Sequence, residues 1–202
     1  MNPDNSNVLL LTAERALVER ARRGDAASFG QLYDAYLPAV YRYCFGRVGR
    51  PADAEDLAEE VFLKVLQSLD RFEWRQVEGS DRSPFRSWLF RIAHNHVASF
   101  HRRAYARLPA SELPETLEDE QRGPSELAET KLGIEEAFAA VRLLPDAQRE
   151  VVLLRFSAGL TVAETAATLG KREPNVRVLQ HKGIKNLRRL MGVEPQVADV
   201  PR

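Results

Sequence analysis

The sequence contains one cysteine, Cys44, so the chain cannot form an internal disulfide. A lone cysteine is typical of proteins in a reducing compartment, and its neighbours Tyr43 and Phe45 favour a buried small side chain over a reactive thiol. No apolar run approaches the roughly 20 residues that a membrane-spanning helix needs. The apolar segment 8–11 also lacks the basic segment that precedes it in a signal peptide. We therefore expect a cytoplasmic protein without membrane insertion.

The sequence also lacks the residue combinations that catalysis requires. It has no glycine-rich phosphate loop, no paired nucleophile and base, and no cluster of residues with metal-ligand spacing. The triplet His94-Asn95-His96 is similar to part of a nuclease site, but its side chains would fall on different faces of one helix. We expect His96 to be a buried core histidine, and the protein to be no enzyme and to hold no metal or cofactor.

The 29 lysines and arginines balance the 29 acidic residues, but the two signs are separated along the chain. Residues 85–107 include five arginines and no acidic residue, residues 112–136 are strongly acidic, and residues 171–189 are basic again. Because local clusters of one sign determine where a polyanion docks, a net charge of zero does not exclude a nucleic-acid partner. The two basic segments are candidate nucleic-acid surfaces.

Apolar residues recur at intervals of three and four along most of the chain, and no segment alternates as a strand would. The pattern predicts helices at residues 12–23, 26–48, 54–69, 85–103, 125–143, 146–156, 162–169 and 174–191. Pro38 predicts a kink or break near Leu37, and Asp53 is the expected N-cap of the third helix. The apolar stripe of the third helix includes Leu66, which we expect in the core.

The composition changes between residues 104 and 124, where prolines, a glycine and many acidic residues replace bulky apolar ones. This change separates two domains. The predicted fold is all-α, with two small helical domains (residues 1–103 and 125–191) joined by a flexible acidic linker (104–124) and followed by a tail (192–202).

The second domain has the pattern of a helix-turn-helix. Thr161 and Glu164 have capping-box spacing, Gly170 suits the end of that short helix, and Pro174 suits the first turn of the next. Val176, Leu179, Gly183, Leu187 and Leu190 are the residues expected to face inward on the second helix. Its outward surface would present Asn175, Arg177, Val178, His181, Lys182 and Lys185.

An outward surface of this kind suits the major groove of DNA. Asn175 and Arg177 are the candidates for base edges, and Lys182, Lys185 and Arg188 are the candidates for phosphates. The alternative is a basic, solvated helix packed on a bundle.

The helix at 85–103 carries a second candidate surface. Its flank aligns Trp88, Arg91, Asn95 and Arg102. A large aromatic side chain, an amide and two guanidiniums suit single-stranded or melted DNA, because bases stack on aromatics and arginines neutralise phosphates. The alternative places Trp88 in the core and leaves the arginines simply solvated, and periodicity alone does not separate the two.

The third predicted helix has an outer face on which an apolar side chain stands among polar ones. The residues of this face are Asp56, Glu59, Glu60, Leu63 and Gln67. A solvated acidic face is one interpretation. The exposed leucine indicates the other, a docking surface for a partner that presents a basic helix.

Read together, four segments resemble the extracytoplasmic-function (ECF) sigma factors of the sigma-70 family. The segments are LVERARRGD (17–25) with Phe29 and Leu32-Tyr33, DAEDLAEEVF (53–62), FRSWLFRIAHN (85–95), and 144–156 with its Leu-Pro, Arg-Glu and LLRF motifs. The second is similar to the polymerase-binding signature of the family, the third to its promoter-melting helix and the fourth to the start of its second DNA-binding domain. They cover nearly the whole chain in the order and spacing of the family.

The resemblance implies a subunit that directs RNA polymerase core enzyme to promoter DNA. The face from Asp53 to Gln67 would bind the clamp helices of the largest polymerase subunit. The loop at 73–84 would capture an unstacked base of the minus-10 element, beside the Trp88 surface. The second domain would read the minus-35 element as duplex, and the linker would run toward the RNA exit path. A cognate anti-sigma factor that masks these faces is a further implied partner.

The sequence departs from the family pattern at two places. At the first, Glu60 replaces a glutamine that is common in the family, which affects the expected affinity for core enzyme. At the second, residues 171–174 (KREP) replace the usual start of the recognition helix, which affects the expected minus-35 sequence. Two other functions compete with the sigma-factor interpretation: a stand-alone helix-turn-helix regulator, and a pure interaction protein such as a decoy for a regulator.

Overall fold

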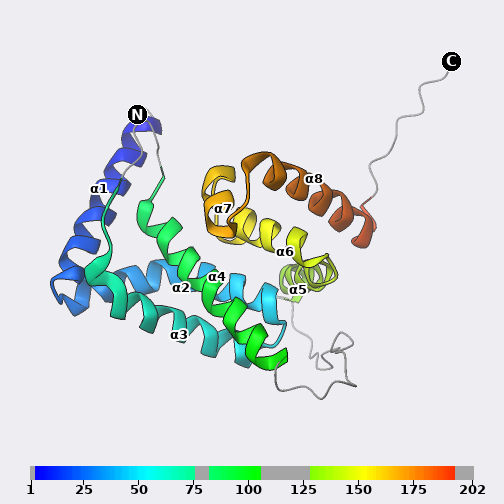
Figure 1. Ribbon diagram of the computed structural model, residues 1–202, viewed down its shortest axis with the longest axis horizontal. Coiled ribbons are helices and arrows are strands. Elements are labelled where there is room, and N and C mark those ends of the chain that lie inside the picture. Colours follow the sequence, from blue (N-terminus) through cyan, green and yellow to red (C-terminus); the bar gives the residue numbers. More distant parts are fainter. Residues whose placement is uncertain (1–2, 76–81, 106–127, 194–202) are drawn as a thin grey trace.

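The protein is described by a computed structural model that covers residues 3–75, 82–105 and 128–193 (Figure 1). Every regular element within these ranges is a helix, as predicted. The first domain contains α1 (Pro3–Arg22), α2 (Ala26–Val48), α3 (Pro51–Ser68), the 3₁₀ turn η1 (Leu69–Arg71) and α4 (Pro84–Tyr105). The second contains α5 (Ala128–Arg142), α6 (Asp146–Val152), the π-helical turn η2 (Leu153–Ser157), α7 (Val162–Leu169) and α8 (Glu173–Leu190). All but the first two residues of the predicted linker (104–124) and most of the tail lie outside the described residues.

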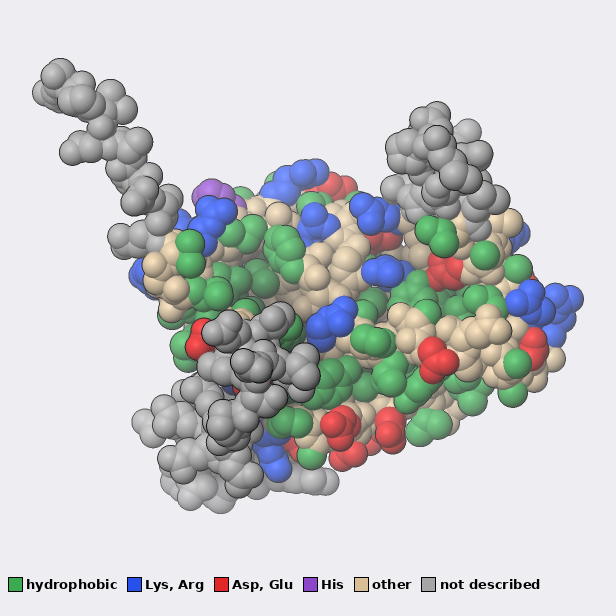
Figure 2. All heavy atoms as spheres, turned by 180° about the vertical axis from the view of Figure 1, so that it is seen from behind, with side chains coloured by type: hydrophobic (Ala, Val, Ile, Leu, Met, Phe, Trp, Pro, Cys, Tyr) green, Lys and Arg blue, Asp and Glu red, His purple; other side chains and the backbone are tan. Residues whose placement is uncertain are grey.

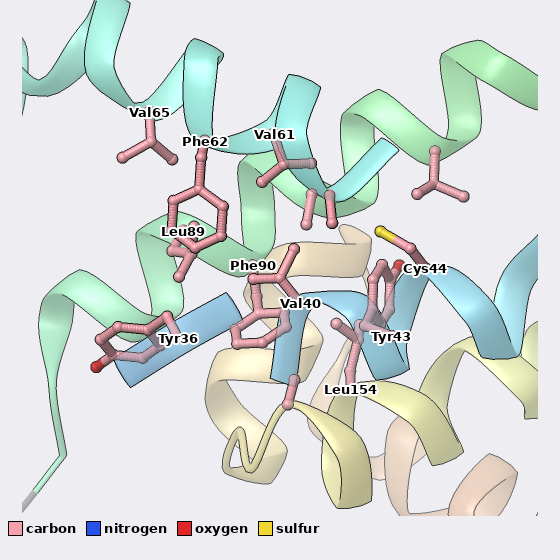
Figure 3. Close-up of a cluster of buried hydrophobic side chains, with 14 of the residues drawn as sticks. Tyr36, Val40, Tyr43, Cys44, Val61, Phe62, Val65, Leu89, Phe90 and Leu154 are labelled. Atoms are coloured by element: carbon pink, nitrogen blue, oxygen red, sulfur yellow. The ribbon is translucent and has the colours of Figure 1, made fainter. Parts of the chain in front are cut away.

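The core of the first domain forms where the apolar faces of α2, α3 and α4 meet (Figure 3). Val40, Val61 and Phe90 are fully buried there. Cys44 is buried in the same core, and burial raises the pKa of its thiol to about 12, so it is the inert small side chain that the sequence indicated.

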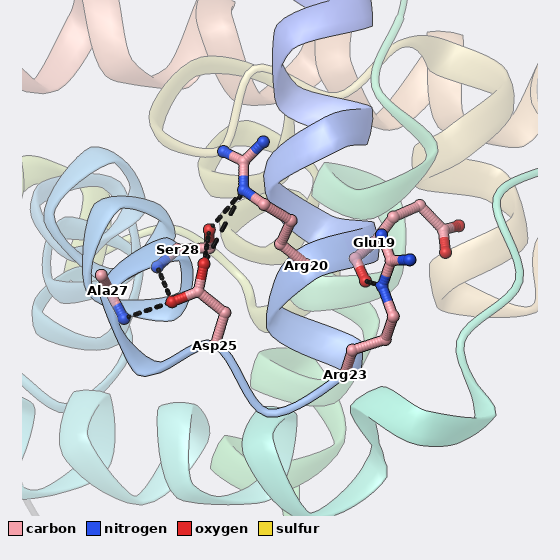
Figure 4. Close-up of polar contacts among 6 residues, drawn as sticks. All are labelled: Glu19, Arg20, Arg23, Asp25, Ala27 and Ser28. Carbon is pink, nitrogen blue, oxygen red and sulfur yellow. Dashed lines mark hydrogen bonds and ion pairs between the residues drawn. The ribbon is translucent and has the colours of Figure 1, made fainter.

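The junction between α1 and α2 is fixed by a capping residue (Figure 4). Asp25 is the N-cap of α2, and its side chain accepts hydrogen bonds from the backbone N–H groups of Ala27 and Ser28 at 3.1 and 3.4 Å. Arg20 at the end of α1 donates to the Ser28 hydroxyl at 2.9 Å. The hydrogen bond from Ser28 Oγ is the main reason that the pKa of Asp25 lies below its usual value.

Several predicted details of the first domain are wrong. Of the predicted kink or break near Leu37, the break is absent: helix α2 continues through Pro38, which lies on the exposed side where water can satisfy the carbonyl group left without its N–H partner. The N-cap of α3 is Arg50 and not Asp53, because Pro51 takes the first helical position and places Asp53 inside the first turn. Leu66 is 51% exposed and not part of the core. Helix α1 also begins at Pro3, well before the predicted residue 12.

The second domain is the predicted helix-turn-helix. The Thr161 hydroxyl accepts from the Glu164 N–H at 3.1 Å, and the Glu164 carboxylate accepts from the Thr161 N–H at 2.7 Å, so the capping box is complete. Gly170 ends α7 in the left-handed region with φ 61°. Gly183 lets α8 pack closely on α6, since a Cβ atom there would lie 2.8 Å from the Val152 side chain.

The two domains share one hydrophobic core. Leu153, Leu154 and Leu160 of the second domain are buried in the same cluster as the first-domain side chains. The two domains approach closely at Gly46 of α2, where the absence of a side chain is required because a Cβ atom there would overlap the Leu153 side chain. The helix-turn-helix is therefore packed directly against α2 and α4, a relationship that the sequence did not predict (Figure 1).

Candidate nucleic-acid interface

The outward surface of α8 is arranged as the sequence predicted. Val176 and Gly183 are buried toward the domain core. All seven residues predicted to meet duplex DNA are exposed or partly exposed on the other side: Asn175, Arg177, Val178, His181, Lys182, Lys185 and Arg188. One inward prediction is wrong, because Leu190 at the end of the helix is 41% exposed. Helix α8 thus presents a basic surface with an apolar Val178 suited to a thymine methyl group.

Two side-chain contacts hold α8 in place, and neither was predicted. Arg155 Nε of η2 donates to Gln180 Oε1 at 2.8 Å, and Asn186 Nδ2 donates to Gln148 Oε1 of α6 at 2.8 Å. On the outer surface, Glu173 Oε2 accepts from Arg177 at 3.1 Å. This ion pair directs the Arg177 guanidinium along the helix toward its N-terminus, where base contacts are made in helix-turn-helix proteins.

A hollow of about 710 Å³ lies beside the start of α4. Trp88 and Arg91 line it together with Arg71 and Phe72, which the sequence pattern did not single out. Trp88 is half-buried, and its ring packs on Phe72 and Phe85 with centroid distances of 4.9 and 5.8 Å. The Trp88 side chain is thus neither wholly in the core nor wholly on the surface, since one part of the ring belongs to the aromatic core and another part lines the hollow.

The rest of the predicted stripe on α4 lies on the surface. Arg91, Asn95 and Arg102 are exposed. The Arg102 guanidinium donates to the Ser99 hydroxyl at 2.8 Å, and this hydroxyl donates to the backbone carbonyl of Asn95 at 2.8 Å. Arg102 is thus held beside Asn95 on one flank of the helix. The loop predicted to capture a base, 73–84, lies partly outside the described residues.

The outer face of α3 combines acidic and apolar side chains. Leu63 is 57% exposed, Leu66 extends the same apolar strip, and Asp56, Glu59, Glu60 and Gln67 are exposed around them. Asp53 differs from the others, because it is half-buried and pairs with Arg50 at 3.5 Å. Figure 2 shows acidic and apolar side chains next to one another along the lower edge of the molecule, and Lys and Arg side chains at the end that carries α8.

His96 is the buried histidine that the sequence predicted, and it faces Glu60 of α3. Burial is the main reason that the pKa of His96 lies below its ordinary value, and Glu60 opposes this shift. In the described part of the chain, no three His, Cys, Asp or Glu side chains come together in a way that could hold a metal ion. The described helices also include none long and apolar enough to cross a membrane.

Comparison with known proteins matches both domains. Residues 32–107 match the family model Sigma-70 region 2, and residues 140–189 match Sigma-70, region 4. The chain is 41% identical over 177 residues to the ECF RNA polymerase sigma factor BldN of Streptomyces coelicolor, covering 87% of this chain and 64% of BldN. It is 38% identical over 187 residues to the ECF RNA polymerase sigma factor ShbA of Streptomyces griseus, covering 87% of this chain and 93% of ShbA.

The fold is similar to that of CnrH, solved in complex with the cytosolic domain of CnrY. The TM-score is 0.61 at 24% sequence identity, and the match covers 91% of this chain and 99% of CnrH. A second neighbour is the sigma factor RpoE of Bartonella quintana, solved in complex with the anti-sigma factor NepR. The TM-score is 0.64 at 23% sequence identity, and the match covers 83% of this chain and 98% of RpoE.

Proposed function

The chain belongs to the ECF RNA polymerase sigma factors of the sigma-70 family, and from its geometry we propose which surface binds each promoter element and which binds the polymerase. As a sigma factor, it is a non-catalytic subunit that directs RNA polymerase to its promoters. Two surfaces that suit nucleic acid, the outer face of α8 and the hollow beside α4, lie on separate domains. Their presence in one chain is the observation that carries the proposal.

Helix α8 reads the minus-35 element as duplex. Asn175 and Arg177 contact base edges, and Lys182, Lys185 and Arg188 hold phosphates. Val178 and His181 lie on the same exposed surface and complete the contact with the major groove. The exposed Glu173–Arg177 ion pair places the Arg177 guanidinium near the N-terminus of α8, the end at which base contacts would be made.

Helix α4 holds the minus-10 strand after melting. The partly buried Trp88 ring offers a fixed platform for an unstacked base, and Arg91, Asn95 and Arg102 follow the backbone of the strand. Promoter opening needs no nucleotide hydrolysis by this subunit. It follows from differential binding, because a surface that binds the flipped base and single strand better than closed duplex shifts the equilibrium toward the open form.

Helix α3 binds the polymerase core. Leu63 and Leu66 supply the apolar centre of the contact, and the surrounding carboxylates of Asp53, Asp56, Glu59 and Glu60, with Gln67, select a partner with a basic helix. An apolar centre within a polar rim is the usual arrangement of a protein-binding surface. The protein would act in the cytoplasm, with the polymerase.

An anti-sigma factor is a further proposed partner. The structural neighbour RpoE is bound to the anti-sigma factor NepR, and this chain has the same fold with an exposed apolar strip on α3. Affinity purification from unstressed cells tests this proposal. Recovery of a stoichiometric third protein would support it, and recovery of only the free chain or of core enzyme would overturn it.

The division of work is tested by footprinting reconstituted holoenzyme on a selected promoter. Permanganate reports unpaired thymines at minus-10, and nuclease protection reports contact at minus-35. Trp88→Ala should lose the permanganate signal but keep minus-35 protection, and Arg177→Ala should weaken the minus-35 protection first. If both variants lost both signals equally, the proposed division between α4 and α8 would be wrong.

A further inference from the structure

Glu14 of α1 lies against the start of α4, the helix that carries Trp88 one turn further on. Oε1 of its carboxylate accepts hydrogen bonds from the Ser83 hydroxyl at 2.9 Å and from the Tyr36 hydroxyl. The Tyr36 hydroxyl also lies 3.4 Å from Ser83 Oγ. A single oxygen atom thus joins α1 to α2 and to the residue directly before α4.

Ser83 is the residue that caps α4. Its Oγ accepts from the backbone N–H of Arg86 at 3.0 Å, which satisfies one of the N–H groups that a helix leaves free in its first turn. A serine hydroxyl has one proton to donate and lone pairs to accept with. Because that proton is donated to Glu14, a lone pair remains for the N–H of Arg86. Glu14 therefore fixes the orientation of the capping side chain.

Tyr36 carries the same restraint to the aromatic side chains of α4. Its ring meets Phe85 edge-on with a centroid distance of 5.5 Å, and Phe85 packs on Trp88 at 5.8 Å. The Arg86 guanidinium lies over the Tyr36 ring, 5.3 Å from its centroid. In Figure 3 the Tyr36 hydroxyl points away from the other labelled side chains. Burial is the main reason that the pKa of this hydroxyl is raised, and Glu14 raises it further, so the hydroxyl stays a donor at neutral pH.

The residues on either side of Ser83 belong to the hollow of about 710 Å³ beside α4. Arg82 and Pro84 form part of its wall, together with Trp88. A displacement of the first turn of α4 would therefore move several side chains of the proposed strand-binding surface at once. Binding surfaces depend on such supporting hydrogen bonds, because an error of a fraction of an ångström in position already weakens them.

The first turn of α4 depends on polar contacts more than the rest of the helix does. Farther along, Leu89 and Phe90 are fully buried and hold α4 by packing. Helix α1 likewise has its own apolar anchors, since Val18 and Ala21 are buried. The Glu14 carboxylate is therefore expected to affect the position of one turn of α4 more than the folding of the domain.

We propose that Glu14 is a positioning residue for promoter opening, which acts through the hydroxyls of Ser83 and Tyr36 to hold the first turn of α4 and the Trp88 ring in place for an unstacked base. The inference rests on the proposed role of α4 in holding the minus-10 strand. Glu14 does not contact the strand itself. It also lies outside residues 32–107, which match the Sigma-70 region 2 model, so the family match does not assign it a role.

Strand binding by reconstituted holoenzyme tests this role, with a fluorescent single-stranded oligonucleotide of the selected minus-10 sequence as the probe. Glu14→Ala should weaken binding by about fivefold or more, because two buried hydroxyls lose their acceptor. Glu14→Gln should stay within about twofold of the unsubstituted protein, because an amide oxygen still accepts from both hydroxyls. Binding of a minus-35 duplex should change in neither variant. Glu136→Ala on the exposed surface of α5 controls for the loss of a carboxylate.

A general loosening of the first domain is the competing explanation, and a second control separates it. Val61→Ala removes methyl groups from the fully buried core, so it should lower the urea midpoint at least as much as Glu14→Ala and leave strand binding unchanged. The fluorescence of Trp88, measured in a Trp74→Phe background, gives a spectroscopic readout. Its emission should shift with Glu14→Ala and stay unchanged with Glu14→Gln and with Val61→Ala.

The outcomes distinguish the positioning role from the proposed function. Unchanged strand binding in a folded Glu14→Ala protein, an equal loss in Val61→Ala, or no rescue by Glu14→Gln would each overturn the positioning role. If Glu14→Ala does not fold, Ser83→Ala tests the same contact from the other side, and unchanged strand binding there would overturn the role as well. Strand binding that Trp88→Ala leaves intact would instead overturn the proposed function of α4.

Discussion

Glu60 on the exposed face of α3 reaches the buried His96 of α4, with Oε2 of the carboxylate 2.6 Å from Nε2 of the imidazole. The acidic residue that departs from the family pattern thus has a structural partner. It joins the face proposed to bind polymerase to the helix proposed to hold the melted strand.

The first prediction concerns this pair. Glu60→Gln removes the carboxylate that opposes the effect of burial, so the pKa of His96 should fall further below its ordinary value. The exposed neighbour Glu59 offers the matched control, and Glu59→Gln should leave the titration of His96 unchanged. NMR titration of the imidazole signals measures both. A rise in the His96 pKa in Glu60→Gln would contradict the assigned interaction.

The second prediction concerns stability at acid pH. Burial lowers the pKa of His94, His96 and His101 below 6.5, so each histidine takes up a proton more readily in the unfolded chain than in the folded protein. Their contribution to stability is therefore present above pH 6.5 and is lost as the pH falls through their folded pKa values. The urea midpoint should be lower at pH 5.5 than at pH 7.5, and His96→Gln should reduce that difference. A midpoint independent of pH would show that these histidines do not destabilise the fold on protonation.

The third prediction separates base from phosphate contacts on α8. Arg177→Ala should cost about 1–3 kcal/mol of binding and relax the preference at one promoter position, because it removes a bidentate donor. Lys185→Ala should weaken binding to all sequences alike and reduce the dependence on salt. Holoenzyme binding to a library of minus-35 variants at two salt concentrations measures both effects. Identical behaviour of the two variants would refute the assignment.

The fourth prediction concerns the α3 face. Leu63→Glu should lower the affinity for core polymerase by about tenfold or more, because it places a charge at the apolar centre of the contact. Leu143→Glu is the matched control, since Leu143 is 59% exposed on the other domain. Competition with a labelled sigma factor for core enzyme measures the affinity. An equal effect of the two variants would show that the contact lies elsewhere.

The fifth prediction concerns Trp88. Trp88→Ala should weaken binding of the minus-10 strand by about 1–3 kcal/mol, the usual contribution of one stacked base. It should also lower the stability of the first domain, because the ring packs on Phe72 and Phe85. Trp88→Phe keeps most of the packing with a smaller stacking surface and should separate the two effects. Strand binding unchanged in a folded Trp88→Ala protein would contradict the proposed role.

The features predicted well from sequence are those that depend on local chemistry. The capping box of Thr161 and Glu164, the left-handed Gly170 and the exposed surface of α8 each follow from residues within a few positions of one another. The burial of His96 also followed from the helical period. Such signals act within one or two helical turns and need no knowledge of the rest of the fold.

The features that could not be predicted from the sequence depend on contacts between distant segments. Leu66 fits the core stripe of α3 by period, but the helices that pack on α3 leave that side exposed. The approach of Gly46 to Leu153 and the Arg47–Glu150 ion pair join residues about a hundred positions apart. No local pattern specifies such a pair, because a small residue in a helix and a charged residue at its end each fit many environments.

Run-off transcription tests the proposed roles of α3, α4 and α8 most directly. Sigma-free bacterial core polymerase transcribes a randomised promoter library with and without this protein, and the transcripts are then sequenced. We expect new starts downstream of two spaced motifs, which disappear with Trp88→Ala or Leu63→Glu and change their upstream motif with Arg177→Ala. No initiation with core enzyme, together with tight binding of one duplex site by the protein alone, would contradict these roles.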